Sequence, residues 1–335
     1  MREASAQVRP RHLVAGDRVA VVAPASRYDS EKMARGVAVL QSWSLQVDIL
    51  VPSQPLRYMS GSDDQRAACL TEAFAREDIA AVIAVRGGYG AARLLGHFDP
   101  AVATTHPKIF LGYSDLTIVL SRLRREAGLV CFHGPMVASD LARLGPDELE
   151  RFRRFLFGEE GWWAGKDLEC RKPGSATGRL AGGCLSIIAT TIGTPYEIDT
   201  RGSVLFLEDI AEPPYRIDRL LTHLLHARKF EGVAAVVLGK FHDCDPPNAP
   251  GQVMAIADEI LGRLGIPVVS GFDAGHLSGG AVLPMGCQVL VNADAGSIEL
   301  QEPVFGNSAP VSSAARDLAR VAAAALRRGP GSLGR

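Results

Sequence analysis

The sequence has no apolar run long enough to cross a bilayer, almost no net charge and no closely paired cysteines. Its longest apolar stretches, near residues 19–23 and 80–85, fall far short of the roughly 20 residues that a membrane-spanning helix needs. The formal net charge of -1 provides no basic field to hold nucleic acid or an anionic membrane surface. We therefore expect neither a membrane protein nor a nucleic-acid-binding one.

Disulfides, metals and a leader segment are also not expected. The six cysteines include no C-x-x-C pair, and in a chain of 335 residues they indicate buried, reduced thiols. Residues 242–245, His-Asp-Cys-Asp, are adjacent, so they cannot all turn toward one ion, and no metal site is predicted. The first twelve residues carry charge and precede no continuous hydrophobic segment, which predicts an unprocessed cytoplasmic protein.

The composition that remains is that of an ordinary globular chain with two cores. Hydrophobic residues make up 47% and charged residues 22%, and 335 residues exceed the size of one common domain. We predict an N-terminal α/β domain over residues 1–157, a linker over 158–177, a C-terminal α/β domain over 178–310, and a helix with a frayed tail over 311–335. The linker holds Trp162 and Trp163, which could stack on a ligand but more often pack against the joined domains.

The order of the expected elements gives the fold class, α/β. In the first half, β-rich runs at 19–23, 45–50, 79–85, 108–112 and 129–132 alternate with helical segments, one of which begins at a Ser62–Gln65 capping box. This alternation predicts a flavodoxin-like, doubly wound parallel sheet. The second half reads as mixed α/β, with a β-meander of short strands at 281–283, 287–291 and 297–300.

Ser114 lies where a buried strand turns into a helix, in the sequence Gly112-Tyr-Ser-Asp115. A serine at such an apex has its hydroxyl clear of the sheet, and the backbone N–H groups after it can face a developing oxyanion. The pattern departs from G-x-S-x-G because Leu116 replaces the second glycine. The alternative is a simple helix cap, a position that both serine and aspartate favour.

A second strand ends in Arg86-Gly-Gly-Tyr-Gly90, a loop whose N–H groups could cradle an anion or an oxyanion. Dinucleotide binding is a weaker interpretation, because the spacing is not G-x-G-x-x-G and the loop does not follow the first strand. Arg86 could bind a carboxylate or form a structural salt bridge. In a parallel sheet, this loop should converge with those carrying Ser26, Ser114 and His133.

A nucleophilic serine needs a base, and the base needs an orienting carboxylate. Glu208 directly follows an apolar strand, and His276 lies in a glycine-flanked loop after the strand that ends near residue 270. The chain order Ser, Glu, His is one that serine hydrolases use. Alternatively, Glu208 could pair with an arginine of the following helix, and His276 could be an ordinary loop residue.

Together these segments resemble the LD-carboxypeptidase family of serine peptidases, which includes murein tetrapeptide carboxypeptidases and microcin C immunity peptidases. The matching segments, in the family's order, are 21–26 (VVAPAS), 86–90 (RGGYG), 112–115 (GYSD), 132–135 (FHGP), 207–209 (LED), 214–218 (PYRID), 275–276 (GH) and 283–286 (LPMG).

The resemblance implies a catalytic triad of Ser114, Glu208 and His276, with an oxyanion hole formed by the backbone N–H groups of Gly88 and Asp115. It also implies a small peptide substrate, commonly a homodimer, and neither metal nor organic cofactor. Immunity-type members carry a longer interval between nucleophile and acid and an aromatic residue that stacks on a nucleotide. The short interval between Ser114 and Glu208 favours the murein-recycling type. Because Trp162 and Trp163 could supply the stacking aromatic residue, an immunity-type or a biosynthetic hydrolase is also a possible interpretation.

A hypothesis from another class also stands. The chain could be a non-catalytic, flavodoxin-like module in which the Gly87-Gly88 loop holds a phosphate or nucleotide and Ser114 only caps a helix. Mutation of Ser114 separates the two, because a hydrolase would lose turnover while a binding module would keep its ligand.

Overall fold

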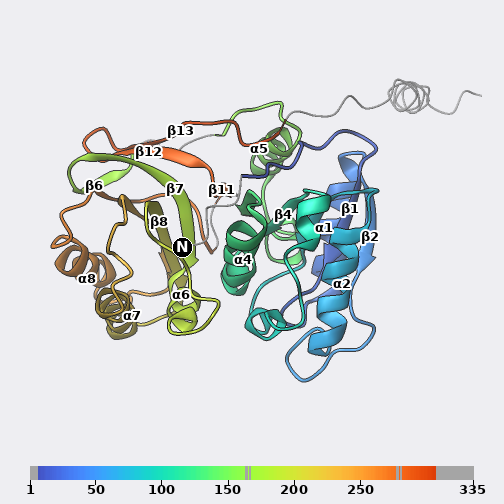
Figure 1. The fold of residues 1–335 in the computed structure, drawn as a ribbon, viewed down its shortest axis with the longest axis horizontal. Coiled ribbons are helices and arrows are strands. Elements are labelled where there is room, and N and C mark those ends of the chain that lie inside the picture. The colour runs from blue at the N-terminus through green and yellow to red at the C-terminus, as the bar shows by residue number, and fades with distance from the viewer. Residues whose placement is uncertain (1–6, 163–164, 166, 277–278, 280, 307–335) are drawn as a thin grey trace, which may run out of the picture.

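The computed structural model describes residues 7–162, 165, 167–276, 279 and 281–306, which form two sheets lying side by side (Figure 1). The first contains the parallel strands β1 (Arg18–Val22), β2 (Gln46–Leu50), β3 (Ile79–Ala84), β4 (Ile109–Gly112) and β5 (Cys131–His133). Their spatial order, β2-β1-β3-β4-β5, is that of flavodoxin-like folds. The prediction of an α/β fold with a doubly wound N-terminal sheet is confirmed.

Helices cover both faces of this sheet because successive strand residues point to opposite sides. Val19 and Val21 pack in one core with α1 (Ser30–Ser42) and α5 (Pro146–Leu156). Ala20 and Val22 pack in the other core with α2 (Asp63–Ala75) and α4 (Thr117–Ala127). The predicted capping box at the start of α2 is present, and a short helix, α3 (Val102–Thr105), precedes β4.

The second sheet is mixed, in the order β13-β12-β7-β8-β9-β10-β6. Its central strands, β7 to β10, are parallel. The strands β6 and β12 run antiparallel to them, and the edge strand β13 runs antiparallel to β12. The strands are β6 (Glu169–Lys172), β7 (Ser175–Cys184), β8 (Ser203–Ile210), β9 (Ala235–His242), β10 (Val268–Ser270), β12 (Gln288–Asn292) and β13 (Ser297–Leu300). The helices α6 (Leu185–Thr191), α7 (Pro214–His226) and α8 (Gln252–Leu261) share one core with β8 and β9, on one face of the sheet.

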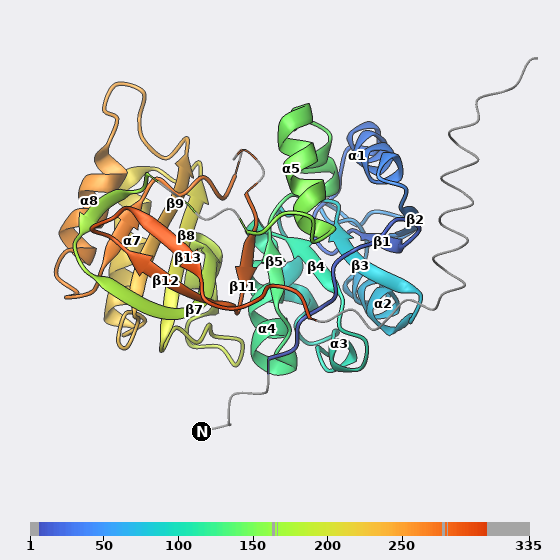
Figure 2. The ribbon, with the colours of Figure 1, turned by 90° about the horizontal axis from the view of Figure 1, so that it is seen from above.

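One detail of the predicted strand arrangement was wrong. The first strand of the expected β-meander is β11 (Leu283–Met285), which pairs antiparallel with β5 and so completes the first sheet (Figure 2). The sequence could not show this, because an apolar triplet fits the free edge of either sheet. The predicted linker contains β6 and the first residues of β7; β6 pairs with β10 along the sheet edge, and its largely exposed side chains give no apolar alternation.

Other expectations concern single residues. The Trp162 side chain packs: its indole N–H donates to the carbonyl oxygen of Val282 at 2.6 Å, and its ring stacks on Phe272. Trp163 and the helix predicted after residue 310 lie outside the described residues. Four cysteines are buried as expected, but Cys69 is partly exposed and Cys170 is exposed. Within the described residues, no helix is both long and apolar enough for a bilayer span.

Candidate active site

Ser114 occupies a strained turn between β4 and α4. The four residues of β4 are fully buried, and the chain then passes through Tyr113 into a single 3-10 turn, Ser114–Leu116, that leads into α4. The φ angle of Ser114 is 62°, in the left-handed region, which costs about 1–3 kcal/mol for a residue other than glycine. Such strain is typical of the turn that lifts a nucleophile above a sheet.

Glu208 and His276 reach Ser114 from the second sheet. Glu208 is fully buried in β8, at a point where the ladder to β9 is interrupted, which is a common device for re-aiming a side chain. His276 lies in the loop after β10. Its Nδ1 is 2.7 Å from Glu208 Oε2, and its Nε2 is 2.9 Å from Ser114 Oγ. The structure therefore brings together the three side chains selected from the sequence.

The chemistry of the carboxylate fixes the direction of these hydrogen bonds. An ionised carboxylate only accepts, so Nδ1–H donates to Glu208, and Nε2 is left to accept the proton of the Ser114 hydroxyl. Glu208 Oε2 also accepts the backbone N–H of His276 at 3.3 Å. Gly275 permits this approach: its φ is 112°, and a Cβ there would lie 2.7 Å from Oε2. The alternative partners of Glu208 in the following helix are Arg216 and Arg219, and within the part of the chain that the structure describes neither is paired with it: Arg216 pairs with Glu212, and Arg219 lies over the ring of Tyr215.

Glu208 also sets the basicity of His276. Burial works against the imidazolium, but the hydrogen bond and charge of Glu208, together with the charges of Asp209 and Asp140, raise the pKa of His276 above its ordinary value of 6.5. A base with this pKa takes a proton from a hydroxyl more readily than a free imidazole does.

Aromatic packing holds the imidazole in place. The Tyr113 ring meets the ring of His276 edge to face at 5.1 Å, and its hydroxyl donates to Asp140 Oδ1 at 3.2 Å. His133, expected in a loop, is instead the last residue of β5, and it is buried between the rings of Tyr113 and Phe206. Burial lowers the pKa of His133 to about 4, so it is neutral at pH 7 and does not compete with His276 for the carboxylate charge.

The glycine loop passes directly over Ser114. A Cβ on Gly87 would lie 2.9 Å from Ser114 Cβ, and one on Gly88 would lie 2.4 Å from Ser26 Oγ. Gly88 has a φ of 104°, and Ser26 Oγ accepts the backbone N–H of Tyr89 at 2.8 Å. Asp115 is in the first turn of a helix, where N–H groups have no intrahelical partner. Of the loops expected to converge, those of Ser26, Gly87, Gly88 and Ser114 do meet.

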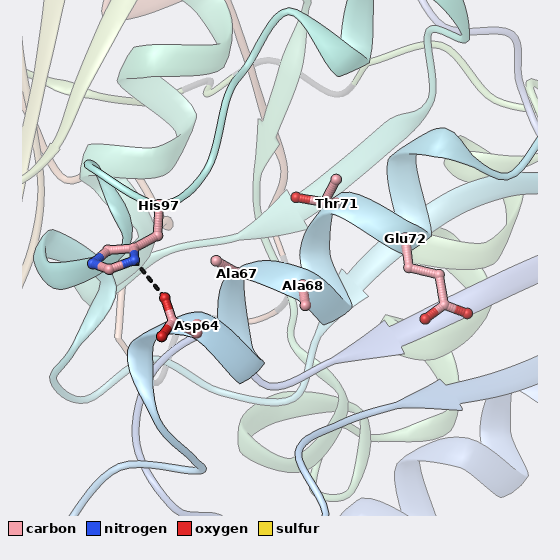
Figure 3. Close-up of a pocket in the computed structure, with 6 residues that line it drawn as sticks. All are labelled: Asp64, Ala67, Ala68, Thr71, Glu72 and His97. Carbon is pink, nitrogen blue, oxygen red and sulfur yellow. Dashed lines mark hydrogen bonds and ion pairs between the residues drawn. The ribbon is translucent and has the colours of Figure 1, made fainter.

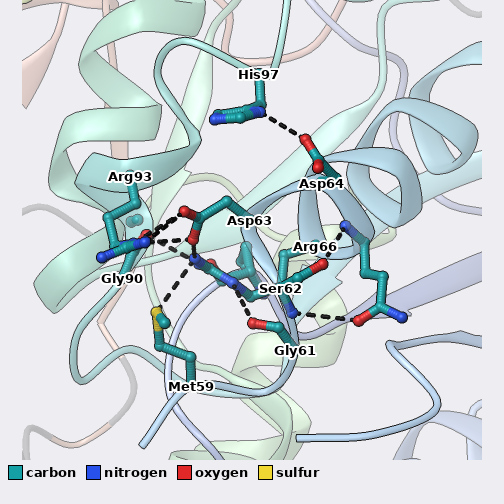
Figure 4. Close-up of polar contacts among 12 residues, drawn as sticks. Met59, Gly61, Ser62, Asp63, Asp64, Arg66, Gly90, Arg93 and His97 are labelled. Carbon is teal, nitrogen blue, oxygen red and sulfur yellow. Dashed lines mark hydrogen bonds and ion pairs between the residues drawn. The ribbon is translucent and has the colours of Figure 1, made fainter. Parts of the chain in front are cut away.

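A buried arginine that the sequence reading missed anchors this loop (Figure 4). The guanidinium of Arg66 donates from Nη1 to the carbonyl oxygens of Pro24 and Gly90, at 2.5 and 2.8 Å, and from Nη2 to Asp63. It thereby ties the loop after β1 to the end of the glycine loop. One signal was available: Arg66 shares the 66, 70, 74 stripe of α2 with two buried apolar residues.

Removing this guanidinium should destabilise the protein. In Arg66→Met, two buried carbonyl oxygens lose their donor, so we expect the free energy of unfolding to fall by about 3 kcal/mol. Urea denaturation measures this change. Arg93→Met is the matched control, because Arg93 pairs with the same Asp63 but is 43% exposed; its loss should cost less than about 1 kcal/mol. Equal losses in the two variants would contradict the anchoring role of Arg66.

A separate hollow of about 430 Å³ lies beside α2 (Figure 3). It is lined by Asp64, Ala67, Ala68, Thr71, Glu72 and His97. His97 Nδ1 lies 2.7 Å from Asp64 Oδ1, and the lining includes none of the three residues that meet at Ser114. His97 and Asp64 thus form a surface pair away from the site.

The two halves of the chain meet at α4, directly behind Ser114. Thr117 Oγ1 accepts the backbone N–H of Cys184 at 3.1 Å, and Arg125 donates to the carbonyl oxygen of Glu197 at 3.0 Å. These contacts connect the helix that follows Ser114 to the half that carries Glu208 and His276.

The described residues contain no cluster of three or more side chains suited to hold a metal ion. The side chains of the site can transfer a proton from the Ser114 hydroxyl to the His276 imidazole.

Comparisons with known proteins agree over most of the chain. The family model of the LD-carboxypeptidase N-terminal domain matches residues 19–134, and that of the C-terminal domain matches residues 177–291. A probable murein peptide carboxypeptidase of Bacillus subtilis is 36% identical over 301 residues, covering 86% of this chain and 92% of its own length.

Solved structures share the fold. A muramoyltetrapeptide carboxypeptidase from Oxalobacter formigenes has a TM-score of 0.75 at 32% identity, over 84% of this chain and 97% of its own. The microcin C7 self-immunity protein MccF, in complex with aspartyl sulfamoyl adenosine, has a TM-score of 0.83 over 89% of this chain and 100% of its own. At 23% identity, this second likeness concerns the fold alone.

Proposed function

This chain belongs to the LD-carboxypeptidase family, and from that premise we propose that it is a serine carboxypeptidase acting on a murein tetrapeptide. It would cleave the amide bond between an L-residue and the terminal D-residue. The observation that carries the proposal is the hydrogen-bonded series of Ser114, His276 and Glu208, which joins the two halves of the chain. Peptidoglycan recycling, a cytoplasmic location and a homodimer extend the proposal through the family resemblance.

In the proposed mechanism, Ser114 Oγ attacks the scissile carbonyl carbon while His276 Nε2 takes the hydroxyl proton. The N–H groups of Gly88 and Asp115 would stabilise the oxyanion that forms. As the tetrahedral intermediate collapses, Nε2–H protonates the leaving amine, and the terminal D-residue departs. His276 then deprotonates a water molecule, which attacks the ester on Ser114 and releases the shortened peptide. Glu208 keeps the imidazole oriented and stabilises its charged form.

A second candidate function is hydrolysis of an aminoacyl-nucleotide amide, the immunity-type activity. Two observations suggest it: the fold is similar to that of MccF, and an aromatic residue, Trp162, is hydrogen-bonded to the half of the chain that carries Glu208 and His276. Against it, the indole of Trp162 is packed on Phe272 and hydrogen-bonded to a backbone carbonyl, so this ring is already engaged. We therefore rank the murein substrate first.

A product assay distinguishes these candidates. We expect the purified protein to release the terminal D-residue from murein tetrapeptide with a kcat/KM at least about 100-fold above that on an acyl-sulfamoyl adenylate. Mass spectrometry of the products measures both reactions. The matched control is the same tetrapeptide ending in the L-enantiomer, which should be a poor substrate. Faster cleavage of the adenylate would favour the immunity-type function. If neither substrate were cleaved, the non-catalytic binding module would be the remaining hypothesis.

A further inference from the structure

Arg86 begins the glycine loop, and its side chain folds back over that loop. Its Nη2 lies 3.7 Å from the position that a Cβ on Gly88 would take. Standard bond lengths put the Gly88 nitrogen within about 2.5 Å of that position, so the guanidinium lies within about 6 Å of the proposed oxyanion donor. Arg86 is thus an exposed, permanently charged group at the edge of the reacting centre.

Within the described part of the chain, no carboxylate is paired with the Arg86 guanidinium. Among the described residues, Arg86 forms no ion pair, and its side chain donates one hydrogen bond, from Nη1 to the carbonyl oxygen of Arg27 at 3.3 Å. Two carboxylates near the end of the loop have other partners: Asp63 is bound by Arg66 and Arg93, and Asp115 accepts the backbone N–H of Ala91. The backbone bond to Arg27 orients the guanidinium and leaves its other N–H groups available to a ligand.

The loop that carries Arg86 is held at several points. The backbone N–H of Ser26 donates to the carbonyl oxygen of Gly87 at 3.3 Å, and Arg66 holds the carbonyl of Gly90. A guanidinium on such a loop is pre-organised, so binding loses less conformational entropy.

We propose that Arg86 binds the terminal α-carboxylate of the substrate and so selects peptides with a free C-terminus. In an acylated D-residue, the carboxylate carbon is three bonds from the scissile carbonyl carbon, which separates them by about 3–4 Å. A carbonyl oxygen placed on the Gly88 N–H therefore brings the carboxylate within reach of the planar fork of Arg86. This inference rests on the proposed hydrolysis and adds the residue that makes it specific for chain ends.

The test compares two substrates that differ only at the terminus: the murein tetrapeptide and its C-terminal carboxamide. We expect the wild-type kcat/KM to be about 100-fold higher for the free acid. In Arg86→Gln, the free-acid value should fall about 100-fold while the carboxamide value stays within about threefold, so that the preference disappears. Arg86→Lys should retain part of the preference, because it keeps the charge and loses the bidentate fork.

Arg57→Gln is the matched control, since Arg57 is another exposed arginine and lies in the loop that pairs with the chain at Ser26. Arg57→Gln should keep the preference for the free acid within about twofold of the wild-type value. If Arg57→Gln lowered this preference as much as Arg86→Gln does, the effect would come from the general positive charge of the surface, and the proposal would be overturned. An Arg86→Gln variant that keeps the wild-type preference would also overturn it. Both results presuppose hydrolysis by the wild type; a wild type that cleaves neither peptide would instead refute the proposed function.

Discussion

Ser114→Ala should abolish turnover while leaving the fold and substrate binding intact. Removal of the nucleophile from a serine peptidase lowers kcat by about 10⁴- to 10⁶-fold, because no other group can form the acyl intermediate. Alanine fits the turn as well as serine does, since both side chains place only a Cβ against a backbone with a φ of 62°. The measurement is kcat on the tetrapeptide, together with the dissociation constant for the same peptide by calorimetry.

The control for this variant is Ser121→Ala, a partly buried serine two turns further along α4. It should retain wild-type kcat within about twofold, as expected for a substitution remote from the reacting atoms. Retention of more than a tenth of the wild-type kcat in Ser114→Ala would rule out Ser114 as the nucleophile. Reaction of the wild type with an acylating inhibitor, followed by mass spectrometry of the peptide that carries Ser114, gives an independent readout.

Ser114, Glu208 and His276 could be selected from the sequence because each was predicted to lie at or after the end of a strand; in the structure Glu208 lies within β8, two residues before its end. Carboxyl ends of parallel strands gather at one edge of a sheet, so a serine after one strand and an acid at the end of another are candidates to meet. Their contact across two sheets could not be derived from periodicity, because it depends on how α4 packs against β7 and α6. The order of motifs, through the family resemblance, supplied that step.

Arg66 and β11 show what the sequence could not provide. Arg66 looks like a helix-surface residue by type, and only the position of two carbonyl oxygens from distant loops explains its burial. Strand β11 is three residues long, and its choice between two sheet edges depends on tertiary packing. In both cases the deciding partner lies far away in the chain, and local propensity carries no information about it.

Glu208→Gln should lower kcat/KM by about 10³- to 10⁴-fold without a large loss of stability. The amide of glutamine can donate to Nδ1, which moves the imidazole proton to Nε2, the nitrogen that must accept from Ser114. Stability should hold because the variant replaces a fully buried charge with a neutral group of nearly the same shape.

The pH profile gives this variant a readout that a structural role would not produce. In the wild type, kcat/KM falls as the pH drops below the pKa of His276, because imidazolium cannot accept a proton, and that limb should lie above pH 6.5. In Glu208→Gln, the burial that lowers the pKa of His276 remains, whereas the carboxylate that contributes most to raising it is gone and only the charges of Asp209 and Asp140 are left, so the limb should move to lower pH. The rate deficit of the variant should therefore be smallest on the acid side.

Glu212→Gln provides the comparison for the loss of one negative charge. Glu212 lies four residues after Glu208 and pairs with Arg216, so its substitution should leave both the rate and the acid limb near their wild-type values. If Glu208→Gln lost stability and rate but kept the wild-type acid limb, Glu208 would be a packing residue and the orienting acid would have to be sought elsewhere. If the limb moves as expected, the charge of Glu208 is acting on His276, which ties the second sheet to the chemistry at Ser114.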